Sequence, residues 1–191
     1  EDKFIKIASE NQFKSEFIVN CLWYSKTLLD KWFPVIYSIQ HLSKLVWYTV
    51  DYIKRSWYPT RQSYMYRHYQ IPKKSGWYRN ISEPLPSLKE IQHRILNNIL
   101  EKVKINKFAK AYIWWRNIKQ HVRYHKWQES VLTLDITDFF WSIHISKVKR
   151  IFKDMGYSDT VSETLSKICT LRWKLAQGSP CSPYISNIYL N

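Results

Sequence analysis

The stretch VLTLDITDFFWSI, residues 131–143, carries the strongest indication of both fold and chemistry in this chain. Val131–Ile136 is a short and almost entirely apolar run, which predicts a strand at the centre of a sheet. Asp135 lies inside that run, and burying its carboxylate is costly unless the carboxylate meets a cation. The structural alternatives are helix capping, which explains Asp138 well and Asp135 poorly, and an ion pair with a lysine. Because enzymes of phosphoryl transfer hold Mg²⁺ with an aspartate at such a strand end, Asp135 is a candidate metal ligand.

Helices and one hairpin are predicted on either side of this stretch. The apolar period shifts towards two around Tyr66–Ile71 and Trp77–Ile81, and Lys73-Lys74-Ser75-Gly76 between them is typical of a hairpin turn. Ser87 and Glu90 form a capping box, which predicts the start of a helix. Helical spacing of apolar residues predicts helices over residues 17–32, 42–53, 87–103, 148–155 and 160–168.

The charge of the chain is strongly positive and unevenly distributed. There are 30 Lys+Arg against 15 Asp+Glu, a formal net charge of +15. Two tracts, Tyr52–Ser82 and Lys102–Gln128, are rich in basic and aromatic residues and contain no carboxylate. This mixture suits nucleic acid, because cations neutralise phosphates while flat rings stack on bases or sugars. The alternatives are a basic surface whose rings are buried in the core, and an anionic membrane surface, which lacks support from any helix with one apolar and one lysine-rich face.

Composition excludes several classes of protein. Hydrophobic residues make up 45% of the chain, which is enough for a core and too many for a disordered protein. The longest uncharged stretches, Phe17–Ser25 and Trp32–Ser43, are shorter than the roughly 18–20 residues that a membrane-spanning helix needs. No secretory signal is recognisable, and the three cysteines lack metal-ligand spacing, which indicates reduced thiols in a cytoplasm. The chain begins with Glu1, so we expect it to be part of a longer protein.

The chain has only three glycines, and the position of each is informative. Gly76 falls in the predicted hairpin turn and Gly156 at the end of a predicted helix, where positive φ angles are common. Gly178, in the segment Gln177-Gly178-Ser179-Pro180, has no such evident structural role. We therefore predict that Gly178 allows the backbone to approach a ligand closely.

Further segments carry a pattern together with residues 131–143: YRHYQIPKKSGWYRNISEP, LKEIQHRILNNIL, FKDMGYS and LAQGSPCSPYISNIYL. In this order they resemble bacterial reverse transcriptases of the retron and phage-defence type, from Tyr64 to Asn191, with a weaker similarity from Pro34. The resemblance implies an α+β fold of the right-hand polymerase type, with fingers and part of a palm. We expect an α-helical N-terminal segment at 1–58, fingers with the hairpin and basic aromatic helices at 59–130, and a partial palm at 131–191.

The resemblance implies roles for residues of the deciding stretch. Asp135 would be the first catalytic aspartate and would bind both metals of a two-Mg²⁺ site, with the carbonyl of Ile136 as a further ligand. Asp138 would border the triphosphate. Phe140 matches a steric gate, a ring that leaves no room for a ribose 2′-hydroxyl, although a core aromatic fits the sequence equally well.

The resemblance also implies a nucleotide site on the hairpin and the glycine segment. Lys73, Lys74 and Arg79 would close on the incoming nucleotide, where arginine suits bidentate phosphate contact; an ordinary solvated hairpin tip is the alternative. Gln177 and Gly178 would contact the nucleotide and the template base pair. Candidate nucleic-acid ligands in the second basic tract are Lys102, Lys107, Arg116, Lys119, Arg123 and His125.

The sequence departs from the family pattern at a few positions. Retron enzymes often carry an Asn-Ala pair before a histidine, and in the matching stretch 121–125 only His125 fits. His121 and His125 have the spacing of zinc ligands on a helix, but without a third ligand nearby we predict no metal site there. Cys181 stands where threonine is commoner.

The resemblance implies an RNA-directed DNA polymerase that transfers nucleotides from dNTPs to a primer hydroxyl with Mg²⁺. The expected partners are an RNA template, for which a dedicated non-coding RNA is a candidate, and primer or product DNA, with no membrane. The expected setting is anti-phage defence in the bacterial cytoplasm.

The family supplies further catalytic carboxylates from a Tyr-Ala-Asp-Asp hairpin, and no such motif occurs before Asn191. We therefore expect these 191 residues to be inactive as a polymerase on their own. Two alternatives stay open: a non-catalytic scaffold that binds RNA or DNA, and a subunit that another chain completes. For residues 1–33 we expect helical packing against a partner protein or a second copy of the chain.

Overall fold

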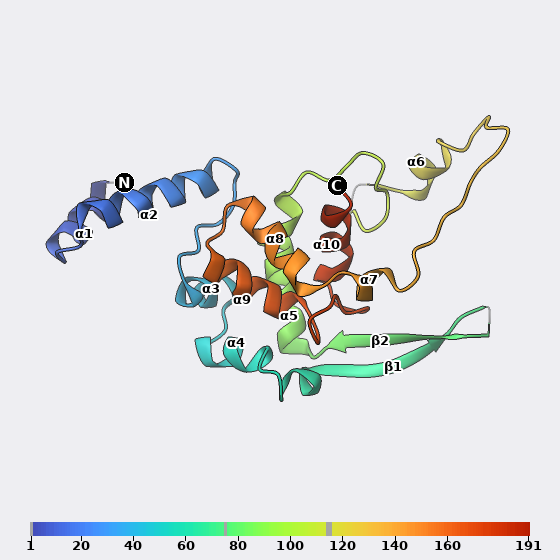
Figure 1. The fold of residues 1–191 in the computed structure, drawn as a ribbon, viewed down its shortest axis with the longest axis horizontal. Helices are drawn as coiled ribbons and strands as arrows, with labels where there is room; N and C mark the ends of the chain where they lie inside the picture. Colours follow the sequence, from blue (N-terminus) through green and yellow to red (C-terminus); the bar gives the residue numbers. More distant parts are fainter. Residues whose placement is uncertain (1, 75, 114–115) are drawn as a thin grey trace.

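A helical body with extensions at both ends makes up the chain (Figure 1). The computed structural model describes residues 2–74, 76–113 and 116–191, so Ser75 of the predicted turn and Trp114 and Trp115 of the second basic tract lie outside it. The elements are, in chain order, α1 (Asp2–Glu10), α2 (Ser15–Leu29), α3 (Ile39–Val46), α4 (Val50–Ser56), the 3₁₀ helix η1 (Gln62–Met65), β1 (Tyr66–Pro72), β2 (Tyr78–Pro84), α5 (Pro86–Asn98), the 3₁₀ helix η2 (Leu100–Lys102), α6 (Ile118–Val122), α7 (Phe139–Ser142), α8 (Ile145–Met155), α9 (Asp159–Cys169) and α10 (Cys181–Tyr189). This mixture of helices and a two-stranded sheet is consistent with the predicted α+β class.

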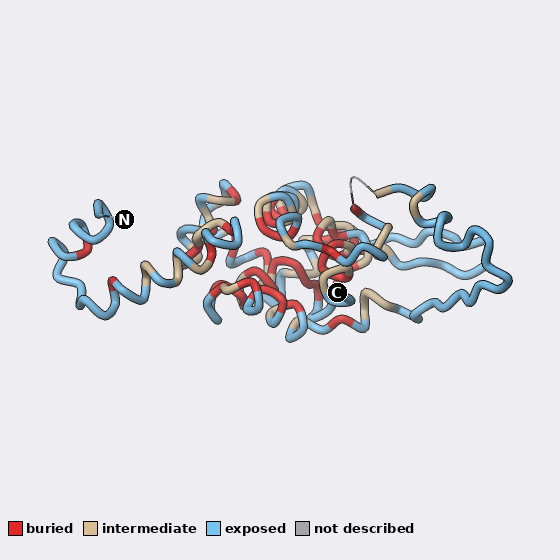
Figure 2. The backbone as a smooth tube through the Cα atoms, turned by 90° about the horizontal axis from the view of Figure 1, so that it is seen from above, coloured by how far each residue is buried: buried red, intermediate tan, exposed pale blue. Residues whose placement is uncertain are grey.

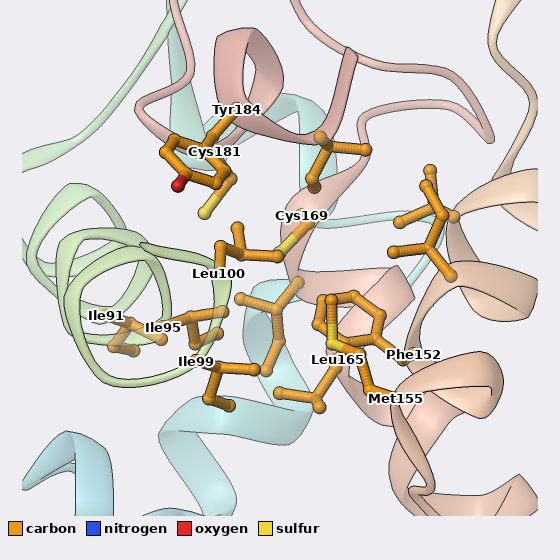
Figure 3. Close-up of a cluster of buried hydrophobic side chains, with 14 of the residues drawn as sticks. Ile91, Ile95, Ile99, Leu100, Phe152, Met155, Leu165, Cys169, Cys181 and Tyr184 are labelled. Atoms are coloured by element: carbon orange, nitrogen blue, oxygen red, sulfur yellow. The ribbon is translucent and has the colours of Figure 1, made fainter. Parts of the chain in front are cut away.

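The hydrophobic core lies where α5, α8, α9 and α10 meet (Figure 3). Leu88, Ile91 and Ile95 recur at helical spacing on α5 and are buried. Phe152 of α8 and Leu165 of α9 belong to the same cluster. Burying a side chain of this size contributes about 1.5–3 kcal/mol. The predicted helices in these three segments are therefore confirmed, with α5 as the central element.

The helix predicted over 42–53 is in fact two helices, α3 and α4. Trp47 ends α3 in the left-handed region, with a φ of 60°. The hydroxyl of Thr49 then caps α4 by accepting the backbone N–H of Tyr52 at 3.3 Å. Both helices bury apolar residues at the expected spacing, so the spacing alone does not reveal the break.

The predicted capping box at Ser87 is wrong. α5 begins at Pro86, and no side chain caps it. Proline suits the first helical position because its φ is already helical and its missing N–H would have no partner there. Glu90 instead accepts the hydroxyl of Tyr48 at 2.7 Å, which ties α5 to the segment between α3 and α4. The helix also ends at Asn98, before the predicted end at residue 103.

The hairpin is formed as predicted. β1 and β2 pair antiparallel, from Tyr66 opposite Pro84 to Pro72 opposite Tyr78. Gly76 lies in the turn with a φ of 82°, a conformation that glycine adopts without steric cost. Burial is confined to the base of the hairpin, and the rest extends away from the body (Figures 1 and 2).

The strand predicted over Val131–Ile136 is not formed. Residues 129–136 have irregular backbone that makes no hydrogen bond to another described segment. Their apolar side chains are exposed, by 53% for Val131 and by 82% for Leu132. A strand needs a neighbouring strand to satisfy its backbone, and the sheet in the described part of the chain pairs only β1 with β2. Asp135 is therefore exposed and does not end a buried strand.

The helices α1 and α2 project from the body on the side opposite the hairpin (Figures 1 and 2). Most of their residues are exposed, including Phe17 and Trp23, while Ile18 and Leu28 are buried. The packing of residues 1–33 against a partner or a second copy stays a prediction. Within the described ranges, no helix has both the length and the apolar character that crossing a membrane requires.

A buried polar cluster joins the base of the hairpin to the body. Gln92 of α5 is fully buried, and its Nε2 donates to the hydroxyl of Tyr66 at 3.1 Å and to the carbonyl of Ile168 at 2.9 Å. The Oε1 of Gln92 accepts the hydroxyl of Ser179 at 2.8 Å, and the thiol of Cys181 donates to the backbone carbonyl of Gln92 at 3.1 Å. Burial raises the pKa of Tyr66 and of Cys181, so both groups keep their protons at neutral pH. Gln92 therefore fixes β1, α5, the end of α9 and the start of α10 relative to one another.

Replacing Gln92 by leucine should lower the free energy of unfolding by about 3 kcal/mol, because buried partners of the amide lose their hydrogen bonds. Urea unfolding followed by circular dichroism measures this loss. Gln128→Leu is the matched control, since Gln128 is exposed and the same change there should cost less than about 0.5 kcal/mol. Equal stability of the two variants would show that the polar cluster does not hold these elements together.

Candidate nucleotide and nucleic-acid site

The tip of the hairpin carries exposed cations. Lys73 and Lys74 lie in the turn, and Arg79 of β2 is opposite Ile71 of β1. None of the three takes part in an ion pair with another described residue. Exposed ammonium and guanidinium groups can bind phosphates, and arginine can do so through two parallel hydrogen bonds. Their contact with a nucleotide stays a prediction.

The segment after α9 lies against the base of β2 (Figure 1). The backbone N–H of Ser82 donates to the carbonyl of Gln177 at 2.7 Å. Gly178 has a φ of 116°, and a Cβ there would lie 2.9 Å from Cγ2 of Ile81 and 3.0 Å from the carbonyl oxygen of Ser82. Gly178 therefore has a structural role that the sequence did not indicate, because only glycine lets these two backbones approach so closely, and its contact with a ligand stays a prediction. The contact holds half-buried Gln177 beside the hairpin.

Asp135 and Ile136 lie in the exposed segment 129–136. The carboxylate of Asp135 is in none of the ion pairs between described residues, so it can accept a cation from outside. A carboxylate and a backbone carbonyl are the oxygen ligands that Mg²⁺ prefers. Among the residues that the structure describes, no three His, Cys, Asp or Glu side chains are grouped to hold a metal ion. Asp135 and Ile136 thus fit one part of a magnesium site, whose other oxygen ligands would be phosphates, water or further carboxylates.

Asp138 and Phe140 flank the start of α7. Asp138 occupies the N-cap position with a left-handed φ of 49°, yet its side chain makes no capping hydrogen bond. Capping therefore does not explain Asp138, and its strained backbone is of a kind that gathers at functional sites. Phe140 is half-buried, with its ring centroid 5.9 Å from that of Phe139, and it packs against the core. This position is compatible with a steric gate and with a core aromatic.

Apart from η2 and α6, the described residues of the second basic tract are irregular, and residues 116–128 form an extension on the same side of the body as the hairpin (Figure 1). Lysines lie over aromatic rings at 5.1–5.2 Å from the ring centroids, in the pairs Lys107–Phe108, Lys110–Tyr124 and Lys126–Trp127. Five of the six candidate nucleic-acid ligands in this tract are exposed: Lys102, Lys107, Lys119, Arg123 and His125. The extension is therefore open to phosphates and to stacking bases.

Two of the six candidate ligands bind the chain's own backbone. The guanidinium of Arg116 donates to carbonyls of the loop 105–109, including that of Ile105 at 3.1 Å. Lys102 donates to the carbonyl of Trp32 at 2.7 Å. Either residue would lose these hydrogen bonds on contacting a phosphate. Binding to the chain's own backbone is therefore an alternative role for both residues, and the charge pattern did not reveal it.

Two features of this region were not predicted from the sequence. The first is a hollow of about 330 Å³ beside the hairpin, lined by His68, Gln70, Asn80, Ser82, Trp141 and Arg172, among others. The alternation of side chains along β1 could have indicated this hollow, because it places the polar residues His68 and Gln70 on one face of the strand. The second is Gln92, whose signal is a polar residue at a core-facing position between Leu88 and Ile95.

Most of the chain that forms these elements is similar in sequence to known proteins. Residues 71–191 match the family described as "Reverse transcriptase (RNA-dependent DNA polymerase)". The chain is 31% identical over 157 residues to the retron Ec86 reverse transcriptase of Escherichia coli, an overlap of 81% of the chain and 48% of that protein. It is 32% identical over 153 residues to the retron Se72 reverse transcriptase of Salmonella heidelberg, with coverages of 79% and 40%. It is also 32% identical over 145 residues to the retron Ec83 reverse transcriptase of Escherichia coli, with coverages of 69% and 46%. The matches thus span less than half the length of each of these relatives.

Gly178→Ala should destabilise the protein more than Gly76→Ala, although both glycines have positive φ angles. An alanine at 76 finds nothing within 4 Å and costs about 1 kcal/mol of backbone strain. An alanine at 178 also collides with Ile81 and Ser82, which adds about 1–3 kcal/mol. Urea unfolding of the two variants measures the difference. Equal losses in the free energy of unfolding would mean that Gly178 is not in close contact with Ile81 and Ser82 of β2.

Proposed function

The chain belongs to the reverse transcriptase family, and on that premise we propose that it forms the fingers and part of the palm of an RNA-directed DNA polymerase. In this proposal residues 1–58 are a helical N-terminal segment, 59–130 the fingers and 131–191 a partial palm. The template is RNA, with a dedicated non-coding RNA as the candidate because the relatives are named as retron enzymes. The product is DNA made from dNTPs, and the setting is anti-phage defence in the bacterial cytoplasm.

The packing of Gln177 and Gly178 on the base of β2 is the observation that supports this proposal most strongly. It anchors one end of a hairpin whose other end presents Lys73, Lys74 and Arg79 to solvent. A cationic hairpin anchored in this way can hold a triphosphate in a defined place relative to the body. Holding the reacting groups in place is the main contribution that a protein makes to phosphoryl transfer.

Asp135 and the carbonyl of Ile136 would hold Mg²⁺, which when bound neutralises charge on the transferring phosphoryl group. The exposure of Asp135 supports this role, because its carboxylate is not used by an ion pair among the described residues. The ring of Phe140 would exclude a ribose 2′-hydroxyl, and the exposed cations of the tract 102–128 would bind the backbone of the template and primer strands.

Asp135→Asn in the full-length protein should reduce Mg²⁺-dependent dNTP incorporation by about a hundredfold to a thousandfold, because a neutral amide replaces a charged ligand. Primer extension on an RNA template measures the rate. Asp154→Asn is the matched control, since Asp154 is a 71% exposed carboxylate on α8 outside the proposed site, and it should leave the rate unchanged.

Unchanged incorporation by Asp135→Asn would overturn the catalytic proposal. A scaffold would instead bind RNA with steep salt dependence and respond neither to Mg²⁺ nor to this substitution. A subunit completed by another chain would incorporate dNTPs only after that chain is added.

A further inference from the structure

A two-residue turn after α9 holds two large side chains on a strained backbone. Leu171 and Lys174 exchange backbone hydrogen bonds at 2.8 and 3.0 Å, which leaves Arg172 and Trp173 as the central residues. Both have positive φ angles, 48° and 68°. Positive φ at both central positions is the pattern of a type I′ turn, for which Asn-Gly is strongly preferred. Arginine and tryptophan are therefore poor residues for the turn itself, and such strain gathers at functional sites.

The surrounding protein fixes this turn in place. The side-chain amide of Gln62 donates to the carbonyl of Thr170 at 2.8 Å and accepts the backbone N–H of Arg172 at 3.0 Å. The carbonyl of Trp173 accepts the backbone N–H of Ile145 at 2.7 Å. With both flanks bonded, the turn presents its two side chains in a defined position.

Arg172 and Trp173 line a hollow of about 300 Å³ between the segment after α4, η1, the start of α8 and the end of α9. Three consecutive residues, Trp57, Tyr58 and Pro59, also line it. Two of these aromatic residues are well exposed, Trp173 by 52% and Tyr58 by 59%. The hollow therefore offers several flat surfaces on which another ring can stack.

The charge of this hollow is positive. No carboxylate is among the described residues that line it. Of its two cations, Lys167 pairs with Glu163 at 2.6 Å, while Arg172 is in none of the ion pairs formed within the described ranges. Arg172 can therefore offer its guanidinium to an anion from outside.

We propose that this hollow binds an unpaired base of a single nucleic-acid strand, stacked on Trp173 and on Trp57 or Tyr58, with a phosphate on Arg172. Aromatic rings stack on any base that is free of a duplex, and a guanidinium binds the neighbouring phosphate. Its volume is at the small end of ligand pockets, which fits one base better than a paired stem. Arg172 also lines the hollow beside the hairpin, so a strand held here continues towards the proposed nucleotide site. The choice of nucleic acid as ligand rests on the proposed function, whereas the site itself needs no catalysis.

The double variant Arg172→Asn/Trp173→Gly tests the proposal, because it installs the residues that the turn prefers and removes both ligand contacts. In the full-length protein it should raise the melting temperature by a few degrees and weaken single-strand binding about tenfold. The probe is a fluorescein-labelled single-stranded RNA of about 12 nucleotides, compared with DNA of the same sequence and with a blunt RNA–DNA duplex. Fluorescence anisotropy without Mg²⁺ and dNTPs measures the affinities.

A matched pair of single substitutions controls for the loss of an exposed tryptophan. Trp173→Ala should weaken single-strand binding about tenfold, and Trp23→Ala, on α2 outside the hollow and 70% exposed, should not. A loss for RNA and DNA that spares the duplex supports the proposal, and a loss for one of the two strands assigns the site to that strand. Unchanged single-strand affinity, or an equal loss for the duplex, overturns it.

Photocrosslinking keeps the test valid if a variant does not fold. RNA containing 5-iodouridine, irradiated on the unsubstituted protein, should crosslink to peptides that contain Trp173 or residues 57–59. Crosslinks confined to the hairpin and to the tract 102–128 would contradict the proposal. Because these assays omit Mg²⁺ and dNTPs and can be repeated with Asp135→Asn, their failure is distinguishable from a failure of the polymerase proposal.

Discussion

The buried amide of Gln92 holds together the segments that the proposed site is built from. It bonds the base of the hairpin through Tyr66, the end of α9 through Ile168 and the segment after Gly178 through Ser179. In a dry core none of these elements can shift without leaving a polar group unpaired. The hairpin, the segment 177–180 and the turn after α9 are therefore held in fixed positions relative to one another. The cations of the hairpin tip project from this arrangement.

Elements with a local signal could be predicted from the sequence, and those that depend on distant partners could not. The period of two and Gly76 were sufficient for the hairpin, and apolar spacing with Gly156 was sufficient for α8. The strand over 131–136 was wrong because partner strands, which a local pattern does not show, decide whether an apolar run is buried. The role of Gln92 was missed because its partners are 26 to 89 residues away in the sequence. The same distinction applies to the candidate-site residues. The exposed cations at the hairpin tip could be predicted from composition, whereas the hydrogen bonds of Arg116 to the carbonyls of the loop 105–109 could not.

Three of the eight described non-glycine residues with positive φ angles lie next to the candidate nucleotide site. Asp138 at the start of α7 and the pair Arg172–Trp173 all have left-handed backbone. The two segments adjoin, since the N–H of Leu175 donates to the carbonyl of Ile143 at 3.2 Å. Such conformations cost about 1–3 kcal/mol each and persist only where the surrounding structure fixes them. The left-handed backbone thus lowers the stability of the region that holds the proposed nucleotide and single-strand contacts. The apolar area buried by α5 and its neighbours offsets this loss.

The role of Asp135 as a ligand of divalent cations can be measured without relying on polymerase activity. Fe²⁺ bound in place of Mg²⁺ reacts with added hydrogen peroxide to give Fe³⁺, hydroxide and a hydroxyl radical that cuts the polypeptide next to the metal, and added ascorbate reduces the Fe³⁺ back to Fe²⁺. With full-length protein, a dNTP and Fe²⁺, we expect cleavage within residues 133–138 that excess Mg²⁺ suppresses and that Asp135→Asn abolishes. Cleavage confined to other segments, or unaffected by that substitution, would contradict it.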